Sequence, residues 1–442
     1  MNPVEIENHL KLVLLSWSVI IAVAWMMGQV AKMFGQPLAV GEIAGGLLLG
    51  PSVLGAISPD SQAWLFPKET QQSLQLLAKI GLIFLLFQVG MEFNYRLLAD
   101  RKRAVLWVSV MGVLASVLAG IAIGPWLHQN FGKGIPQVGF QMFICVALSI
   151  SALPIMGRIL FEMKLERTAI GALGISSAAL VDIANWIMLA VATALVKSQF
   201  NGSRVVAQLI GVVALFLLLK YSIGPWLRKI WRATSEKEGS SMPMSFLALL
   251  LVVLMATCLA TAQLGVFSIF GAFMLGVVLS EEEGLVRAWR ERLAGFVIIA
   301  LVPVFFTNTG LRTEIGSLQG TTAWMGCALV LLAAVVGKLG GCWLGARLAG
   351  QSNEEAKCVA ALMNTRALMG LVAINIGLEL GLLTKELFTM FVIMALFTTV
   401  MTMPLLRWWL PKELRDSGNG EQRHCVRDGL TIWLILVSTD LL

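Results

Sequence analysis

Apolar runs of about 20 residues recur along nearly the whole of the 442-residue chain. A run of that length allows one helix to cross the hydrocarbon core of a bilayer. Charged residues make up only 13% of the chain, whereas a soluble domain carries about 25%. We therefore predict an all-α polytopic membrane protein with about 13 spans. The predicted spans lie at roughly 13–33, 38–57, 74–94, 104–126, 138–161, 167–196, 205–227, 243–263, 265–280, 293–311, 321–346, 357–380 and 386–409.

Lys and Arg are concentrated in the short loops on one side of these spans. Basic loops mark the cytoplasmic side of a membrane protein, so we expect the N-terminus outside and the C-terminus in the cytoplasm. The same bias accounts for the net charge of +7 without a nucleic-acid partner. We expect a transmembrane domain over residues 1–410, a short cytoplasmic tail over 411–442, and a place in the bacterial inner (plasma) membrane.

Two of the predicted spans look interrupted. ALSISALPIMGRIL (147–160) contains Pro154, and ALMNTRALMGLVAINIG (361–377) contains the polar run Asn364 to Arg366. Irregular backbone at membrane depth is tolerated only where it lines a cavity or is buried in protein. The interruptions fall in the fifth of spans 1–6 and the fifth of spans 8–13, two groups of opposite topology. This pattern indicates an inverted repeat with a transporter site near the bilayer midplane.

Asp182 lies near the centre of an apolar run, in SSAALVDIANW (176–186), with no adjacent Lys or Arg. An ionised Asp at this depth costs about 2.5–3.5 kcal/mol, so we predict that a proton and a metal cation compete for its carboxylate. The alternatives are a protonated Asp bonded to a backbone carbonyl, or a static ion pair. Ser149 and Ser151 lie beside the first interruption. Their hydroxyls could ligate an alkali cation, or could instead bond to carbonyls of their own helix.

Other charged residues lie within the spans or near their ends. Lys338, in VVGKLGGCWLG, could pair with a carboxylate when the cation is absent, or could extend to the interface. Arg366 could neutralise the carbonyl ends of the interrupted helices, and we favour this architectural role over transport. Glu42 and Glu92 lie towards cytoplasmic ends of spans, where they could form a vestibule, pair with loop arginines or be solvated. Lys79, near an outer end, is typical of a snorkelling side chain.

No constellation of residues is typical of an enzyme. The six Cys form no CxxC and no cluster with His, and no nucleophile arrangement or phosphate-binding loop is visible. We therefore expect no catalytic residue, no cofactor and no structural metal site.

Five stretches occur in an order and spacing that carry a family resemblance: GEIAGGLLLGPSVLG, SISALPIMGRIL, SAALVDIANWIMLA, PVFFTNTGL and NTRALMGLVAINIGLELGLL. Over roughly residues 10–410 the chain resembles the monovalent cation:proton antiporter-2 family, especially the plant cation/proton exchangers and their bacterial relatives. The resemblance implies a panel-like dimerisation domain and a mobile core in which two unwound helices cross beside an essential aspartate. It also implies elevator-type exchange of Na⁺ or K⁺ for H⁺, usually by a homodimer.

The resemblance also assigns roles to individual positions. Asp182 matches the ion- and proton-binding aspartate, and Lys338 matches a membrane-embedded lysine that can pair with a core acid. Ser149 to Pro154 match the first unwound helix. The second unwound helix is matched by Asn364, Thr365 and Arg366.

Val181 departs from the family pattern, because relatives often carry Asp, Asn or Gln before the aspartate. In the family a second carboxylate there is associated with electrogenic exchange, so we expect one cation to exchange for one proton here. A cation-coupled symporter and a membrane sensor that retains the fold without net transport stay open as alternatives. The sequence does not choose between Na⁺ and K⁺.

Overall fold

The computed structural model of the protein describes residues 3–92, 102–163, 165, 168–197, 202–238 and 242–411. Within these ranges the chain is helical or irregular and contains no strand. The prediction of an all-α protein is therefore confirmed. Apart from Pro411, the predicted tail lies outside the described residues.

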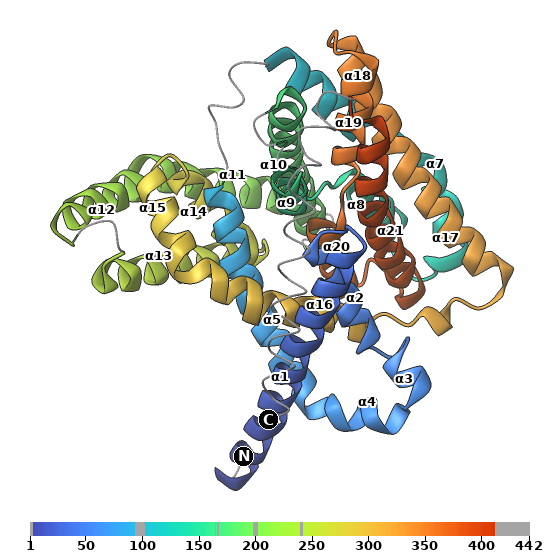
Figure 1. The fold of residues 1–442 in the computed structure, drawn as a ribbon, viewed down its shortest axis with the longest axis horizontal. Coiled ribbons are helices and arrows are strands. Elements are labelled where there is room, and N and C mark those ends of the chain that lie inside the picture. Colours follow the sequence, from blue (N-terminus) through green and yellow to red (C-terminus); the bar gives the residue numbers. More distant parts are fainter. Residues whose placement is uncertain are drawn as a thin grey trace, which may run out of the picture.

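The helices are shown in Figure 1. Their bounds are α1 (Pro3–Met33), α2 (Leu38–Leu48), α3 (Leu54–Ile57), α4 (Pro59–Leu65), α5 (Lys68–Met91), α7 (Lys102–Phe131), α8 (Gln137–Ser149), α9 (Leu153–Glu162), α10 (Ala169–Lys197), α11 (Gly202–Leu218), α12 (Gly224–Glu238), α13 (Met244–Gln263), α14 (Ser268–Leu279), α15 (Glu283–Trp289), α16 (Val302–Leu311), α17 (Gly320–Val335), α18 (Gly341–Leu348), α19 (Asn353–Met363), α20 (Ala367–Glu379) and α21 (Lys385–Trp409). Single π-helical turns join α11 to α12 (Leu219–Ile223) and α17 to α18 (Val336–Gly340).

Nine helices of the described part are long and apolar enough to cross a membrane, and the total is eleven if each of two bent helix pairs forms one span. One of these pairs is α19 with α20, which bend by 41° at their junction. Two further apolar helices, α2 and α14, are shorter. The polytopic architecture is thus confirmed, while the total of about 13 spans stays a prediction.

The helices form two packed groups (Figure 1). We call α7 to α10 with α17 to α21 the core group, because these helices pack mainly on one another. The second group, the panel, is a row in which each helix contacts the next, in the order α1, α2, α16, α5, α14 and α13. In Figure 1 the core group lies at the upper right, and the panel lies below it and to its left.

The order of helices in the panel shows the inverted repeat. Exchanging α1 with α13, α2 with α14 and α5 with α16 reproduces the same row in reverse. In the core group, α10 contacts α7, α8 and α9, and α21 correspondingly contacts α17, α19 and α20. The repeat predicted from the two interrupted spans is therefore present in the packing of the helices.

Glycines allow equivalent close contacts in the two halves of the panel. A Cβ at Gly46 of α2 would lie 2.6 Å from the backbone of Phe306 on α16. A Cβ at Gly276 of α14 would lie 2.2 Å from the carbonyl oxygen of Phe87 on α5. Both distances are shorter than any side chain tolerates, so the backbones approach closely only because these positions lack a Cβ.

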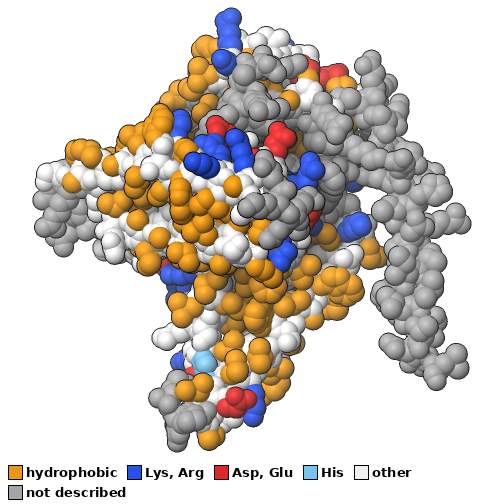
Figure 2. Space-filling view, turned by 90° about the vertical axis from the view of Figure 1, so that its left-hand side faces the viewer, with side chains coloured by type: hydrophobic (Ala, Val, Ile, Leu, Met, Phe, Trp, Pro, Cys, Tyr) orange, Lys and Arg blue, Asp and Glu red, His pale blue; other side chains and the backbone are white. Residues whose placement is uncertain are grey.

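The outer surface of the described part carries many large apolar side chains. Trp25 of α1, Leu114 of α7, Ile210 of α11 and Val252 of α13 are all exposed. Figure 2 shows many hydrophobic side chains spread over the side of the molecule formed by α11 to α15. Such a surface is compatible with contact to lipid rather than water.

Candidate functional site

Two interrupted helices cross inside the core group. Helix α8 ends at Ser149 and α9 begins at Leu153, while α19 ends at Met363 and α20 begins at Ala367. The Ala152 amide donates to the Thr365 carbonyl at 2.7 Å, and the Ser151 hydroxyl donates to the Met363 carbonyl at 3.0 Å. The irregular backbone of each interruption therefore finds partners in the other, as burial at membrane depth requires.

Pro154 lies just after the first interruption, as the second residue of α9. A Pro fits the first turn of a helix, where its missing N–H would have no intrahelical partner. The irregular residues are 150–152, which lie between α8 and α9. Pro154 thus marks the start of the second half-helix rather than the break itself.

Two buried, positively charged side chains donate to the last carbonyl groups at the C-terminus of α8. Lys338, in the π-helical turn between α17 and α18, donates to the Ser149 carbonyl. Arg366 donates through Nη1 to the Leu148 carbonyl and through Nη2 to the Ala334 carbonyl, the latter at 2.7 Å. Both side chains are fully buried. A cation near the last carbonyls of a helix is favourable because those groups carry partial negative charge.

Asp182 lies at a helix N-terminus, that of α9, whereas Lys338 and Arg366 lie at the C-terminus of α8. Its carboxylate accepts a hydrogen bond from the Leu153 amide, the first residue of α9. A carboxylate is stabilised at a helix N-terminus for the same reason that anions bind there. The residue is 3% exposed, and its Oδ2 has no hydrogen-bond partner among the described residues. Lys338 acts on it electrostatically, but no ion pair joins the two within the described ranges.

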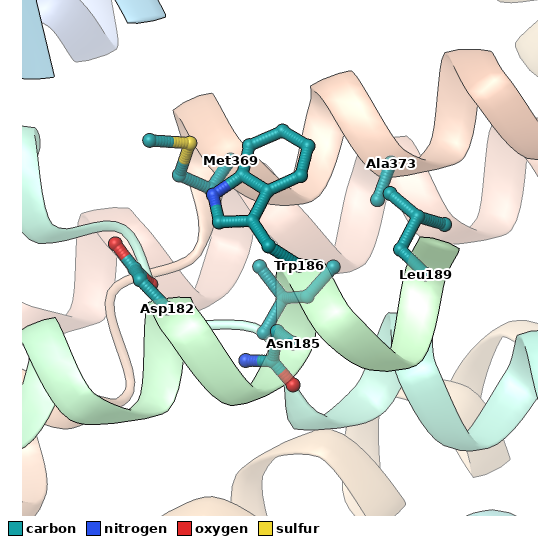
Figure 3. A pocket seen from close by; sticks show the side chains of 7 residues that line it. Asp182, Asn185, Trp186, Leu189, Met369 and Ala373 are labelled. Atoms are coloured by element: carbon teal, nitrogen blue, oxygen red, sulfur yellow. The ribbon is translucent and has the colours of Figure 1, made fainter. Parts of the chain in front are cut away.

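A cavity of about 10 Å³ lies beside the Asp182 carboxylate, roughly the room that one water molecule needs. It is lined by side chains from α10 and α20 together with Ile150 of the first interruption (Figure 3). Met369 and Ala373 are the lining residues from α20. The described conformation thus holds Asp182 almost closed off from its surroundings.

The model of the transmembrane sodium/hydrogen exchanger family matches residues 18–410. The chain belongs to this family. Its membership confirms the resemblance to cation:proton antiporters that the five sequence stretches indicate.

Several curated relatives have names that agree with the family. The chain is 35% identical to the Na(+)/H(+) antiporter NhaS4 of Synechocystis, over 90% of this chain and 97% of that protein. It is 32% identical to Cation/H(+) antiporter 19 of Arabidopsis thaliana and 27% identical to K(+)/H(+) antiporter 1 of Saccharomyces cerevisiae. These two alignments cover 92% and 87% of this chain but only 50% and 46% of the relatives. The chain therefore spans about half the length of the plant and yeast proteins.

One solved structure shares the fold. The sodium proton antiporter MjNhaP1 from Methanocaldococcus jannaschii matches 93% of this chain and 100% of its own, with a TM-score of 0.62 and 15% identity. At that identity the match supports the architecture alone.

In this exchanger-family chain, Asn185 is a site residue that the sequence reasoning missed. It is buried, lines the cavity beside Asp182, and donates to the Ser149 carbonyl at 3.2 Å. The Ser149 hydroxyl lies 2.5 Å from Asn185 Oδ1 and 2.9 Å from the Val146 carbonyl. A second polar residue three positions after Asp182 was the available signal, because residues three apart share a helix face.

Other predicted site residues lie in or beside the two interruptions. Asn364 follows α19 and is fully buried, and neither polar atom of its amide has a partner in the described part of the chain. The Thr365 hydroxyl donates to Thr402 on α21 at 3.2 Å. The predicted ligand roles of Ser149 and Ser151 stay predictions.

Glu42 and Glu92 each have an arginine neighbour. Glu42 is half-buried on α2 and interacts electrostatically with Arg158 of α9. Glu92 follows α5 and lies 3.6 Å from Arg290. These contacts agree with the expected pairing to arginines, while the vestibule stays a prediction. Among the described residues, no group of three or more His, Cys, Asp or Glu could hold a metal ion.

Proposed function

We propose that the protein exchanges a monovalent cation for a proton across the membrane, and that both ions use Asp182. The observation that carries the proposal is a buried carboxylate beside two crossing interrupted helices in a member of the sodium/hydrogen exchanger family. The relatives named for sodium, potassium and unspecified cations support it. The reaction needs no covalent step, in keeping with relatives that are named as transporters.

The hydrogen bonding of Asp182 suits a shared site. One oxygen is held by the Leu153 amide, while Oδ2 has no partner in the described part of the chain and is available to a proton or a cation. A bound proton or a bound cation neutralises the negative charge of the carboxylate. An empty, ionised carboxylate at this depth costs about 2.5–3.5 kcal/mol. This cost opposes movement of the core group while no ion is bound to Asp182. An exchanger needs such a barrier, because movement without a bound ion would uncouple the transport of the two ions.

Oxygen atoms of α10 and of the two interruptions would complete the coordination of the cation. Candidates are the hydroxyls of Ser149 and Ser151 and the amide oxygens of Asn185 and Asn364, all of which are buried. Oxygen ligands suit a hard alkali cation. Relatives named for Na⁺ and for K⁺ keep the proposal at the level of a monovalent cation.

We place the movement between the core group and the panel, in an elevator-type cycle. Asp182, both interruptions, Lys338 and Arg366 all belong to the core group, so the site can move as one unit. Trp186 of α10 contacts the panel through the Phe270 and Phe273 rings, at centroid distances of 6.1 and 5.9 Å. Apolar contacts of this kind have no fixed hydrogen-bond geometry and permit sliding.

We infer the stoichiometry from the charges near the site. Val181 supplies no second carboxylate, and Lys338 and Arg366 are engaged by backbone carbonyls. One cation would then exchange for one proton, and the cycle would be electroneutral. We further propose a homodimer in the bacterial inner membrane, with the N-terminus outside and the C-terminus in the cytoplasm.

The test is cation-driven proton movement in proteoliposomes that contain a pH-sensitive dye. Na⁺, K⁺ and Li⁺ are supplied separately to wild type, Asp182→Asn and the control Glu281→Gln, whose residue pairs with Arg228 away from the site. We expect dye recovery with at least one cation, lost in Asp182→Asn and kept in the control. Electroneutral exchange would proceed at the same rate when an ionophore sets the membrane potential.

A folded and correctly oriented wild type that moves no protons with any of the three cations would contradict the proposal. A cation-coupled symporter or a sensor would then be favoured. These two alternatives differ in whether Asp182→Asn removes solute uptake or only a response to ligand.

A further inference from the structure

A second and larger cavity lies where α20 of the core group meets the panel. Its volume is about 150 Å³, and its lining comes from α5, α14, α16 and α20. Several lining side chains are polar, including Gln75, Asn308, Asn375 and Glu379. A cavity of this size has room for several water molecules, and the polar lining groups could bind them, unlike the small space beside Asp182.

One face of α20 borders both cavities. Met369 and Ala373 line the cavity at Asp182, while Val372, Ile376 and Glu379 line the larger one. Residues spaced three or four apart lie on the same side of a helix. Along α20 the linings of the two cavities therefore meet at Val372 and Ala373, and the larger cavity continues to the C-terminal end of the helix.

A set of polar contacts at this end fastens α20 to the panel. Glu379 lies 3.1 Å from Lys79 of α5 and 3.6 Å from Arg312, which follows α16. Asn375 donates to the Thr309 hydroxyl at 2.9 Å and accepts from Arg312 at 3.3 Å. We call these five residues the α20 clamp. Every one of its contacts joins the core group to the panel.

We propose that the α20 clamp is a gate over the larger cavity, closed in the described conformation, which must release α20 for ions to pass between this cavity and Asp182. The inference rests on the proposed exchange function and adds to it the residues that control access from this side. The clamp lies on the side opposite the predicted basic loops, because Lys79 lies in the first half of α5, whereas Glu379 ends α20 and Arg312 follows the end of α16.

The strength of the clamp suits repeated opening. The Glu379 side chain is 28% exposed and that of Lys79 is 55% exposed, and ion pairs with such access to water are individually weak. The Asn375 contacts are neutral or singly charged hydrogen bonds. Together these contacts bias the equilibrium towards closure without preventing release.

The first test measures access to the larger cavity and does not depend on transport. Asn308→Cys places a thiol in the cavity lining, and the five described native cysteines are buried. A membrane-impermeant maleimide is added to proteoliposomes, with the parent lacking Asn308→Cys as background. We expect Glu379→Gln to raise the labelling rate about two- to fivefold, the size that weak ion pairs allow. Glu281→Gln, which breaks an ion pair with Arg228 of α12 and touches no residue of the α20 clamp, should not change it.

The second test asks whether opening is needed for exchange. In Lys79→Cys/Glu379→Cys, a short bifunctional methanethiosulfonate reagent should link the two thiols and lower cation-driven proton movement at least tenfold, and a reductant should restore it. The unlinked double variant and both single variants should still exchange, which separates failure of the gate from failure of the proposed function. Equal labelling rates in Glu379→Gln and Glu281→Gln, or full-rate exchange by the linked protein, would overturn the proposal.

Discussion

Arg366 provides a test of how the crossing helices are held together. Its buried guanidinium donates to the carbonyls of Leu148 and Ala334, which belong to α8 and α17. Arg366→Leu removes both bonds and leaves two buried carbonyls without this donor. A hydrogen bond to a charged group contributes about 1.5–3 kcal/mol, so two contribute about 3–6 kcal/mol. Leu also avoids the cost of desolvating a guanidinium. We therefore expect a net loss near the lower end, about 3 kcal/mol.

The assay is reversible unfolding of the purified protein in detergent, followed by intrinsic tryptophan fluorescence against denaturant concentration. Arg366→Lys keeps a positive charge, but one ammonium group cannot donate to both carbonyls as the planar guanidinium does. About half of the loss in the free energy of unfolding should therefore remain. The matched control is Arg347→Leu, because Arg347 is exposed and donates to the Gln351 carbonyl at 2.7 Å. Its effect should stay within about 1 kcal/mol.

The outcome decides between two roles for Arg366. If Arg366→Leu unfolds within about 1 kcal/mol of wild type and yet loses cation-driven proton movement, the architectural explanation is wrong. Arg366 would then act in transport itself. A loss of stability that Arg366→Lys partly restores would support the architectural role.

Three further changes test the packing around the site. Asn185→Ala removes two hydrogen-bonding contacts to Ser149 and should lower the free energy of unfolding by about 1–2 kcal/mol; exchange should continue at a reduced rate, because Asp182 is kept. Gly276→Ala places a Cβ 2.2 Å from the Phe87 carbonyl oxygen and should lower the free energy of unfolding by at least about 1–3 kcal/mol. The control is Gly340→Ala, where the new Cβ meets open space, and it should leave the free energy of unfolding unchanged in the same assay. Thr399→Val removes the hydroxyl that accepts from the Arg366 and Ala367 amides and should cost about 1 kcal/mol, so an unchanged denaturation midpoint would argue against this capping role.

The features that follow from short stretches of sequence were predictable. Apolar length indicates helices whatever their neighbours are, and a polar run such as Asn364 to Arg366 cannot continue an apolar span without a special reason. The matching positions of the two interruptions indicated an inverted repeat, and the family resemblance implied that the interrupted helices cross. Pro154 was placed at the break because Pro disrupts a helix, but the first turn of a helix tolerates it equally well.

The contacts between distant segments were not predictable in the same way. Lys338 could pair with a carboxylate or extend to the interface, and in the described conformation it donates to the Ser149 carbonyl, 189 positions away in the chain. Lys79 was expected to snorkel, and the structure adds an ion pair with Glu379, 300 positions away, that the sequence did not indicate. Both lysines are compatible with several partners on chemical grounds. Only the relative placement of the helices selects one of them, and hydropathy carries no information about that placement.

Different side chains accept from the first amide of the equivalent helices α9 and α20 in the two repeats. Asp182 on α10 accepts from the amide of Leu153, the first residue of α9. Thr399 on α21 accepts from the amide of Ala367, the first residue of α20, at 3.0 Å. Since α10 and α9 correspond to α21 and α20 in the repeat, the carboxylate and the hydroxyl occupy equivalent places.

The difference between these two residues lies in more than charge. The Thr399 hydroxyl also donates to the Ala395 carbonyl at 2.8 Å, so its donor and acceptor capacity is used within the protein. Asp182 keeps one oxygen without a partner in the described part of the chain. The repeat therefore offers two positive helix ends, but within the described residues only the end at α9 faces a carboxylate oxygen that has no hydrogen-bond partner. That asymmetry is the structural counterpart of the proposed cycle, in which a single carboxylate carries either one cation or one proton.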